Sequence, residues 1–230
     1  MSDITTADFG IVVCSDIACP WAHIAVHRLD RAIRDRGLGS ELTVDHRAFP
    51  LEVVNDRPTP KQLLDSEVQV CAAVEPDAGW SFDPDPWTYP VSTLPALEAV
   101  QAAKAQGSDV SVRLDRALRR AMFAEWRCLA VHAVVFEIAA SVDGVDVDAL
   151  RDVVRSGDAR AEVWNQLDAA LQADVPGSPT FVLPDGTRSH NPGIELRGEH
   201  DGDGSIVVDA DDHEAIGALV DAAVALRPAD

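Results

Sequence analysis

The sequence has few cationic side chains. Among its 230 residues, 19 are Lys or Arg and 39 are Asp or Glu, which gives a formal net charge of −20 at pH 7. A protein with this charge repels the phosphates of nucleic acids and the headgroups of anionic lipids. We therefore expect neither a nucleic acid nor a membrane among the partners of this chain.

Long hydrophobic runs are absent as well. No stretch approaches the roughly 18 apolar residues that a membrane-spanning helix needs. The N-terminal MSDITTADFG also lacks the basic and apolar regions of a secretory signal. We therefore expect a cytoplasmic protein, whose four cysteines would be reduced thiols. Their positions, 14, 19, 71 and 128, match neither a disulfide framework nor a zinc site, so no metal is expected.

The apolar pattern at the start of the chain predicts a strand, a helix and a second strand. Residues 11–15 form a short apolar run, and apolar side chains then recur at helical spacing from residue 20 until glycines at 37 and 39. Residues 42–49 alternate as a strand does. A helical crossover makes two consecutive strands parallel, so this segment predicts a βαβ unit.

Helical spacing dominates from residue 61 to residue 173, and strand patterns return only after it. Residues 180–183 and 187–190 are joined by a PDG turn, and residues 205–208 form a further short strand pattern. We expect Asp211 and Glu214 to begin the last helix as a capping box.

Neither end of the chain makes a complete sheet without the other, because two parallel strands need the later hairpin for independent stability. The expected fold is therefore α/β, with a discontinuous domain of residues 1–55 and 174–230. An all-helical insertion of residues 56–173 would separate its βαβ half from its ββα half.

Cys19 lies where the first strand meets the first helix. Pro20 suits the first helical position, because its missing N–H would have no partner there. A sulfur beside the free N–H groups of a helix start is stabilised as a thiolate, so we expect a lowered thiol pKa and a nucleophilic Cys19. The alternative is a small buried hydrophobic residue at a helix cap.

A second feature is the segment DVPGSPTFV, residues 174–182. Pro179 enters a strand, where a trans proline is awkward, and this favours a cis bond between Ser178 and Pro179. Such a bond would let the Ser178 backbone approach a neighbouring site. The alternative is a trans proline that begins the strand.

The CPWA and SPTF motifs, with a helical block between them, resemble the DsbA-like thioredoxin-fold family. The resemblance is closest to the cytoplasmic branch that includes 2-hydroxychromene-2-carboxylate isomerase-like and polyketide-associated DsbA proteins. It extends over roughly residues 9–226, with further matches in VDHRAFPLE, RALRRAMFAEWR and GSPTFVLPDGTRSHNPG. It implies a thioredoxin fold in which Cys19 is the nucleophile and Ser178–Pro179 is the cis-proline dipeptide that faces it. It also implies that Glu125 lies near the site.

The active-site motif, Cys19–Pro20–Trp21–Ala22, departs from the family at its last residue. Dithiol members have a resolving cysteine where this chain has Ala22, and without it Cys19 cannot release a partner by intramolecular attack. The resemblance then implies a monothiol oxidoreductase without a tightly bound cofactor, whose mixed disulfide is resolved by glutathione or mycothiol.

Several alternatives to this activity stay open. Kappa-class glutathione transferases and the chromene isomerases resemble the single-residue arrangement, so a glutathione- or mycothiol-dependent isomerase or transferase is one of them. A non-catalytic thioredoxin-fold binding protein and a redox sensor are the others. In the enzymatic cases the partner is a small thiol or another small molecule. A homodimer is left open.

Other residues have a weaker claim to a role in the site. His23, one turn after Cys19, could support a thiolate or be a partly exposed helix residue, and with His27 it lacks a third metal ligand at a suitable spacing. Cys14 and Cys71 are expected in the core, and Cys128 is a weaker candidate for a redox partner. The aromatic residues Trp21, Trp80, Phe82 and Trp87 could line a pocket or pack in the core. The acidic segment 199–212 is expected to be a solvated turn and not a calcium loop.

Overall fold

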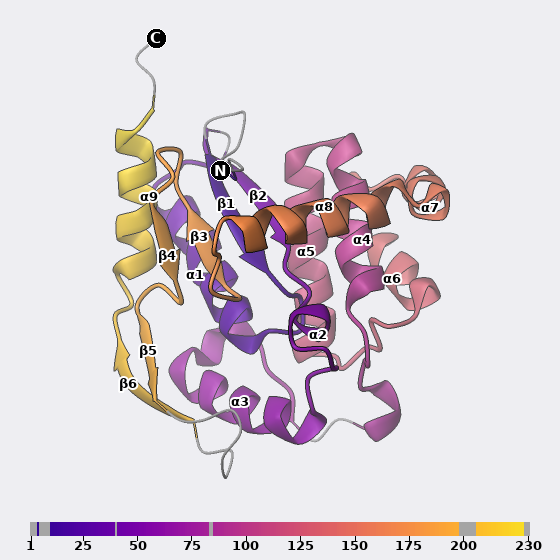
Figure 1. The fold of residues 1–230 in the computed structure, drawn as a ribbon, viewed down its shortest axis with the longest axis horizontal. Coiled ribbons are helices and arrows are strands. Elements are labelled where there is room, and N and C mark those ends of the chain that lie inside the picture. The colour runs from indigo at the N-terminus through magenta and orange to yellow at the C-terminus, as the bar shows by residue number, and fades with distance from the viewer. Residues whose placement is uncertain (1–3, 5–9, 40, 83–84, 198–205, 228–230) are drawn as a thin grey trace.

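A four-stranded sheet forms the centre of the molecule (Figure 1). The computed structural model describes residues 4, 10–39, 41–82, 85–197 and 206–227. The strand order is β2–β1–β3–β4, with β1 parallel to β2 and with β3 antiparallel to both β1 and β4. The predicted βαβ unit and the later hairpin are therefore both present, and they join into one sheet. The strands are β1 (Gly10–Ser15), β2 (Thr43–Ala48), β3 (Thr180–Val182) and β4 (Arg188–His190).

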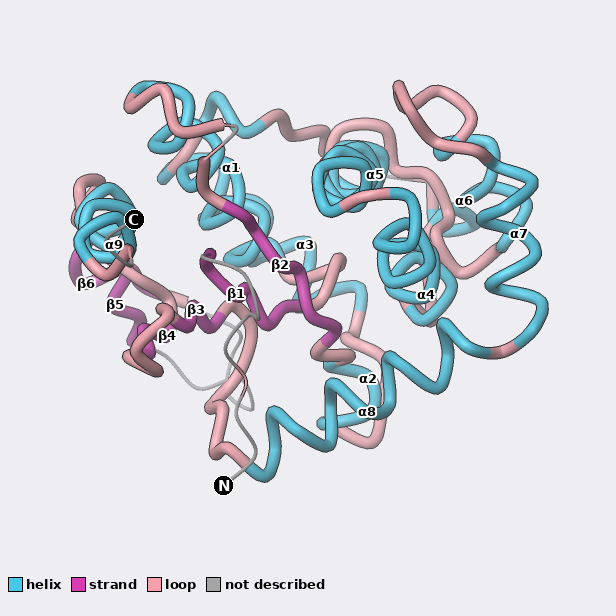
Figure 2. Tube along the Cα trace, turned by 90° about the horizontal axis from the view of Figure 1, so that it is seen from above, coloured by secondary structure: helices cyan, strands magenta, loops and turns pink. Residues whose placement is uncertain are grey.

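Helices cover both faces of the sheet (Figure 2). Every residue of β1 is buried, as expected for a strand with both faces covered. Ile11 and Val13 pack against helices α1 (Pro20–Asp35) and α9 (Ala215–Ala225). The alternate residues, Val12 and Cys14, pack against helix α8 (Asp158–Gln172) on the other face.

The segment between β2 and β3 is helical, and its helices other than α2 share one apolar core with a residue that follows β1 and a residue at the end of β2. Ile17 and Ala48 belong to this core, and α4, α5 and α8 all contact β2. The division of the chain at residues 56 and 173 remains a prediction. Besides α8, the helices of this segment are α2 (Leu51–Val54), α3 (Lys61–Val74), α4 (Leu94–Ala103), α5 (Ser108–Phe123), α6 (His132–Ala139) and α7 (Val147–Ser156). Within the described ranges, no helix has both the length and the apolar character needed to cross a bilayer.

A separate hairpin of β5 (Ile194–Arg197) and β6 (Val207–Asp211) precedes α9. The predicted strand at 205–208 is therefore displaced toward the C-terminus. The predicted capping box is wrong, because Asp211 ends β6 and α9 begins after Glu214 without a side-chain cap. Gly193 is required before β5, since its φ is +83° and a Cβ there would lie 2.3 Å from the Asp212 carbonyl oxygen.

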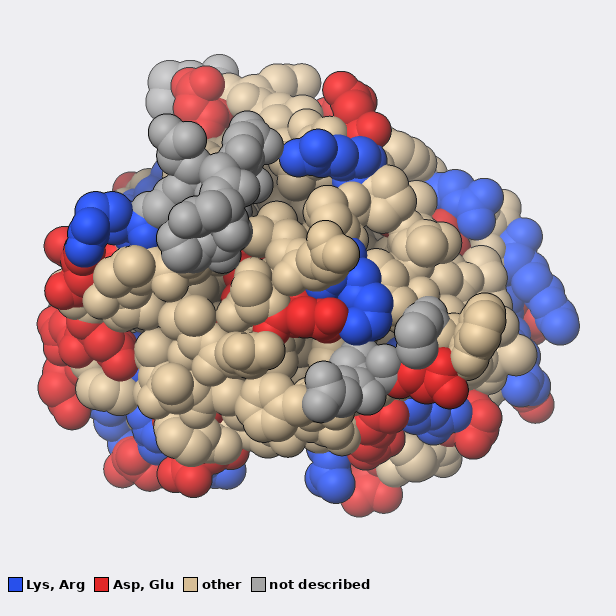
Figure 3. All heavy atoms as spheres, turned by 90° about the horizontal axis from the view of Figure 1, so that it is seen from below, with Lys and Arg blue, Asp and Glu red and all other residues tan. Residues whose placement is uncertain are grey.

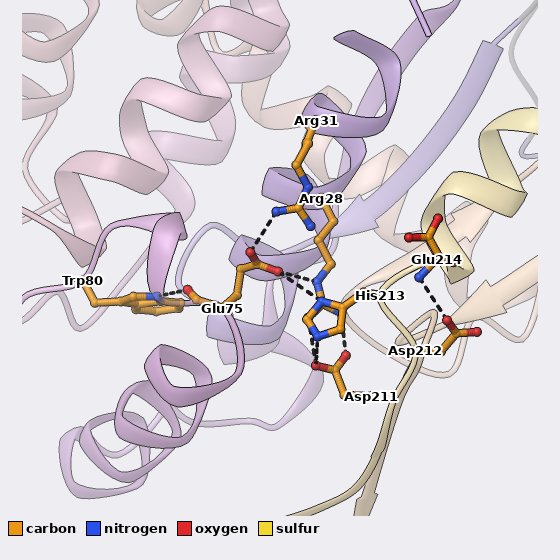
Figure 4. Close-up of polar contacts among 8 residues, drawn as sticks. All are labelled: Arg28, Arg31, Glu75, Trp80, Asp211, Asp212, His213 and Glu214. Atoms are coloured by element: carbon orange, nitrogen blue, oxygen red, sulfur yellow. Dashed lines mark hydrogen bonds and ion pairs between the residues drawn. The ribbon is translucent and has the colours of Figure 1, made fainter. Parts of the chain in front are cut away.

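A buried cluster of charges ties this hairpin to α1 and to the residue that follows α3 (Figure 4). Arg28 on α1 donates to Glu75 through Nε at 2.6 Å and to both carboxylate oxygens of Asp211 at 2.7 and 3.0 Å. Arg31 donates to Glu75 at 3.0 Å, and His213 Nε2 lies 3.0 Å from Asp211. This cluster takes the place of the predicted cap, since Asp211 pairs with Arg28 instead of with a helix N–H.

Candidate active site at the start of helix α1

Three strand ends meet at one edge of the central sheet. Because β3 is antiparallel to its two neighbours, its beginning lies beside the ends of β1 and β4, and Thr180 pairs with both Cys14 and His190. The segment after β1 leads to Cys19, and Pro179 directly precedes β3. Cys19, Ser178 and His190 line one pocket of about 500 Å³. The structure thus brings together two segments that lie about 160 residues apart in the sequence.

Cys19 is the N-cap residue of α1, and its sulfur contacts two backbone groups. Sγ accepts a hydrogen bond from the Ala22 N–H at 3.4 Å and donates one to the Ser178 carbonyl at 3.3 Å. The Ser178–Pro179 peptide bond is cis. The Asp16 N–H donates to Ser178 Oγ at 3.0 Å, so Ser178 is held to the β1–α1 turn as well as to the cysteine.

The prediction of a lowered thiol pKa is wrong for this structure. Cys19 is 4% exposed, and burial raises its pKa to about 12. The carboxylates of Glu67 and Asp16 act in the same direction, and the Ala22 N–H opposes them. The free energy needed to remove a thiolate from water exceeds the stabilisation that the N-terminus of the helix provides. The resting group at neutral pH is therefore the thiol.

A buried polar group holds the turn between β1 and Cys19. Asp16 accepts the Ala18 N–H at 2.9 Å and the Leu51 N–H at 2.7 Å, and burial raises its pKa. Its backbone carbonyl accepts from Arg119, a 1%-exposed guanidinium that also pairs with Asp115 at 2.7 Å. Sequence reasoning missed this support, although the spacing of four residues between Asp115 and Arg119 is a helix-pair signal.

The motif's tryptophan lies in the wall of the pocket. Trp21 is 4% exposed and donates through Nε1 to Glu67 on α3 at 3.1 Å. Trp80, Phe82 and Trp87 are not among the described residues that line this pocket, and Trp87 is 86% exposed. Of the aromatic candidates named from the sequence, Trp21 is therefore the one placed beside Cys19.

His23 packs in the interior and does not approach the Cys19 sulfur. It is 7% exposed, its Nε2 lies 2.9 Å from the Ala78 carbonyl oxygen, and its ring stacks on Phe123. Burial lowers its pKa to about 4, so it is neutral at pH 7. With His27 it lines a different pocket, of about 370 Å³. The expectation of a partly exposed residue is wrong, and no described contact joins its imidazole to the thiol.

Glu125 follows the end of α5. Its carboxylate is 44% exposed and pairs with Arg120 at 3.3 Å. It is not among the described residues that line the Cys19 pocket. That Glu125 lies near the site therefore stays a prediction of the resemblance.

All four cysteines are free thiols. Burial raises the pKa of Cys14 to about 11 and that of Cys71 further, as expected for core positions. Cys71 lies in the same apolar cluster as Cys19, and Cys128 is half-buried. The described residues contain no group of three or more His, Cys, Asp or Glu side chains that could hold a metal ion. Residues 199–205 of the calcium-like segment lie outside the described residues.

The pocket has side chains that sequence reasoning did not assign to the site. His190, at the end of β4, and Asn191, which follows it, line the pocket together with Gly177 and Ser178, and Arg57 lines it as well. Arg57 and Glu67 contribute one charge of each sign. The face of the molecule seen from below is similar, with acidic and basic side chains adjoining one another within a mostly uncharged surface (Figure 3). The register of the hairpin with the strand after Pro179 is the signal that could have revealed His190.

The fold is similar to that of several solved structures. A probable DsbA oxidoreductase from Streptomyces coelicolor is 22% identical with a TM-score of 0.67, over 97% of this chain and 93% of that one. The cytosolic disulfide reductase DsbM from Pseudomonas aeruginosa, solved also with GSH, is 16% identical with a TM-score of 0.64, over 95% and 100%. A 2-hydroxychromene-2-carboxylate isomerase is 18% identical with a TM-score of 0.55, over 78% and 87%.

Comparison with curated protein sequences finds no match. The family model described as a DSBA-like thioredoxin domain matches residues 10–215, which is most of the chain. The predicted thioredoxin fold, with helices between its two halves, is therefore confirmed, and the chain belongs to the family of DSBA-like thioredoxin domains.

Proposed function

We propose that this protein is a thiol–disulfide oxidoreductase that acts through Cys19 alone, together with a small thiol such as glutathione or mycothiol. The observation that carries the proposal is the contact between the Cys19 thiol and the Ser178 carbonyl inside a 500 Å³ pocket. Ala22 is fully buried where a second cysteine would otherwise stand, so the second thiol comes from outside the motif.

The proposed reaction has two exchange steps. In the first, Cys19 loses its proton, attacks one sulfur of a substrate disulfide and forms a mixed disulfide, while the other sulfur leaves as a thiolate and takes a proton. In the second, a small thiol attacks the mixed disulfide on the substrate sulfur, and Cys19 leaves and is protonated. One turnover therefore releases one substrate sulfur as a thiol and leaves the other in a disulfide with the small thiol. A second molecule of the small thiol completes the reduction by attacking this disulfide, which releases the second substrate thiol and leaves the two small thiols joined as a disulfide.

The size and chemistry of the pocket support a small thiol as the co-substrate. Ligand pockets span about 300–1,000 Å³ and combine apolar walls with a few polar groups, and this pocket falls within that range. Arg57 and Glu67 give it groups that can pair with a carboxylate and an ammonium. The similar fold of DsbM, which was solved with GSH and is described as cytosolic, supports both glutathione as the ligand and the cytoplasm as the location.

A thiol-dependent isomerase is the second candidate. It is favoured by the similar fold of the chromene-carboxylate isomerase and by a pocket that buries its thiol instead of presenting it to a large substrate. In that case the bound thiol adds to a small molecule and is released unchanged. The two candidates differ in whether disulfide is consumed.

The test measures covalent capture and turnover. The protein is incubated with glutathione disulfide, and the adduct is located by mass spectrometry of peptides. Reduction of a small disulfide by glutathione is then followed for the wild type, Cys19→Ala and Cys128→Ala. We expect an adduct on Cys19 and turnover that disappears in Cys19→Ala and persists in Cys128→Ala. Equal turnover in the wild type and Cys19→Ala would refute the proposal, and turnover no faster than the uncatalysed reaction in both would leave a non-catalytic protein.

A further inference from the structure

We propose that His190 is a further catalytic residue of the Cys19 pocket, where it accepts the proton of the incoming small thiol. This inference rests on the proposed function and adds to it the group that activates the second reactant. A base is needed because an ordinary thiol, with a pKa near 8.5, is only a few per cent ionised at pH 7.

The position of His190 follows from the register of the sheet. His190 pairs with Thr180, the residue after Pro179, and the Asn191 N–H donates to the Pro179 carbonyl at 3.0 Å. The imidazole lies against Gly177, where a Cβ would be 3.1 Å from the ring carbon Cε1. Glycine at this position therefore leaves room for the ring beside the dipeptide that contacts Cys19.

The hydrogen bonds around His190 assign its tautomer. The Thr180 hydroxyl donates its single proton to the Gly177 carbonyl, with an Oγ1–O distance of 2.7 Å. Its 3.1 Å contact with His190 Nδ1 therefore requires Nδ1 to be the donor. In the neutral ring, Nε2 then carries the lone pair, and this is the nitrogen that can accept a proton.

His190 is an exposed residue at the end of β4, and its partial desolvation is the main cause of its lowered pKa, against a backbone hydrogen bond with Pro179 that acts in the other direction. The ring is therefore neutral at pH 7, which is the state a base needs. The charged groups in the walls of the same pocket are Arg57 and Glu67, one of each sign.

Asn191 provides a second observation that points to a ligand. Its Nδ2 lies 3.3 Å from His190 Nε2, a long contact that a ligand S–H can replace. Its Oδ1 is buried and has no hydrogen-bond partner among the residues that the structure describes. A buried acceptor without a partner is costly, and an N–H from a bound ligand would satisfy it. The ligand class is therefore a thiol that also carries an amide, as glutathione and mycothiol both do.

Release of Cys19 from the mixed disulfide conserves protons and electrons. The ligand S–H gives its proton to His190 Nε2, and the resulting thiolate attacks the substrate sulfur of the Cys19 mixed disulfide. The bond between the substrate sulfur and Cys19 breaks, and its electron pair stays on Cys19 Sγ. His190 then returns the proton to Cys19, and both residues regain their resting states.

The experiment follows the release of a preformed mixed disulfide on Cys19, in a Cys128→Ser background so that the accessible thiol is absent. Two thiols are compared at pH 7: glutathione, which must lose a proton, and 2-nitro-5-thiobenzoate, which is already a thiolate. Because an ordinary thiol is only a few per cent ionised at pH 7, we expect His190→Gln to slow release by glutathione about tenfold and to leave release by the aromatic thiolate unchanged. His132→Gln, a change on helix α6, serves as the matched control and should slow neither.

The possible outcomes test the role of His190 and the proposed function separately. An unchanged glutathione rate in His190→Gln overturns the role of His190 while the proposed function stands. Equal losses with both thiols, repeated in His190→Asn, show a structural role and also overturn it. If glutathione cannot release the adduct from the wild type, the proposed function fails, and the role of His190 fails with it.

Discussion

Replacing Arg28 by methionine tests the buried charge cluster that holds the β5–β6 hairpin. Arg28 is 2% exposed, and its partners Glu75 and Asp211 are 6% and 18% exposed. Methionine keeps the length of the chain and removes the charge, which leaves two carboxylates short of a partner. Breaking a buried pair costs about 3–5 kcal/mol.

The remaining partners reduce this cost. Glu75 keeps Arg31 at 3.0 Å, and Asp211 keeps His213 at 3.0 Å. We therefore expect a loss of about 3 kcal/mol in the free energy of unfolding at pH 7, near the lower end of that range. For a protein of this size, such a loss lowers Tm by about 6–12 °C.

Urea denaturation of the wild type, Arg28→Met and Arg36→Met measures the effect. Arg36 is the matched control, because its guanidinium also contacts one carboxylate twice, at 2.6 and 2.9 Å from Asp221, but that carboxylate is 63% exposed. An exposed pair contributes less than about 1 kcal/mol. Equal losses in the two variants would refute the reasoning, because burial would then not decide the strength of the pair.

Three further predictions concern other parts of the molecule. Burial lowers the pKa of His46 to about 4, so the unfolded chain binds a proton first as pH falls, and stability should decline between about pH 6.5 and 4. Urea titrations at several pH values should show that the free energy of unfolding of His46→Asn falls less steeply with pH, by about 1.4 kcal/mol per pH unit. The same pH dependence in the variant and the wild type would contradict this prediction. At pH 8, mass mapping should find that iodoacetamide modifies Cys19 roughly a thousandfold more slowly than free cysteine, with Cys128 modified first. In urea denaturation, Gly193→Ala should lower the free energy of unfolding by about 1–3 kcal/mol. Gly39→Ala, with no atom within 4 Å of the new Cβ, should lower it by less than about 1 kcal/mol.

Local patterns predicted the parts of the site that depend on neighbouring residues. The apolar run before Cys19, the proline after it and the proline before β3 indicated where strands end and a helix begins. These signals depend on backbone preferences and on side-chain spacing within a few residues. That the segment around Cys19 faces the segment around Ser178 and Pro179 came from the family resemblance, because the spacing of residues in the sequence does not predict this contact.

The electrostatic character of the site could not be predicted in this way. A helix start lowers the pKa of a thiol in water, but Cys19 is enclosed by Trp21, Ile24 and Cys71 from two helices. Burial of a charge depends on everything packed around it, and most of that packing comes from distant segments. The same reason explains the low pKa of His23, whose surroundings include Phe123, 100 residues away in the sequence.

The sequence by itself thus determined the fold class and the ends of the β1–α1 turn, and its family resemblance implied that Cys19 lies opposite Ser178 and Pro179. Only the tertiary structure decided that the thiol is protonated at rest, that His190 lies in its pocket and that Asp211 pairs with Arg28. The physical reason is the range of the interactions. Backbone conformation is set within one or two turns of the chain, whereas desolvation and buried ion pairs depend on groups that folding brings together.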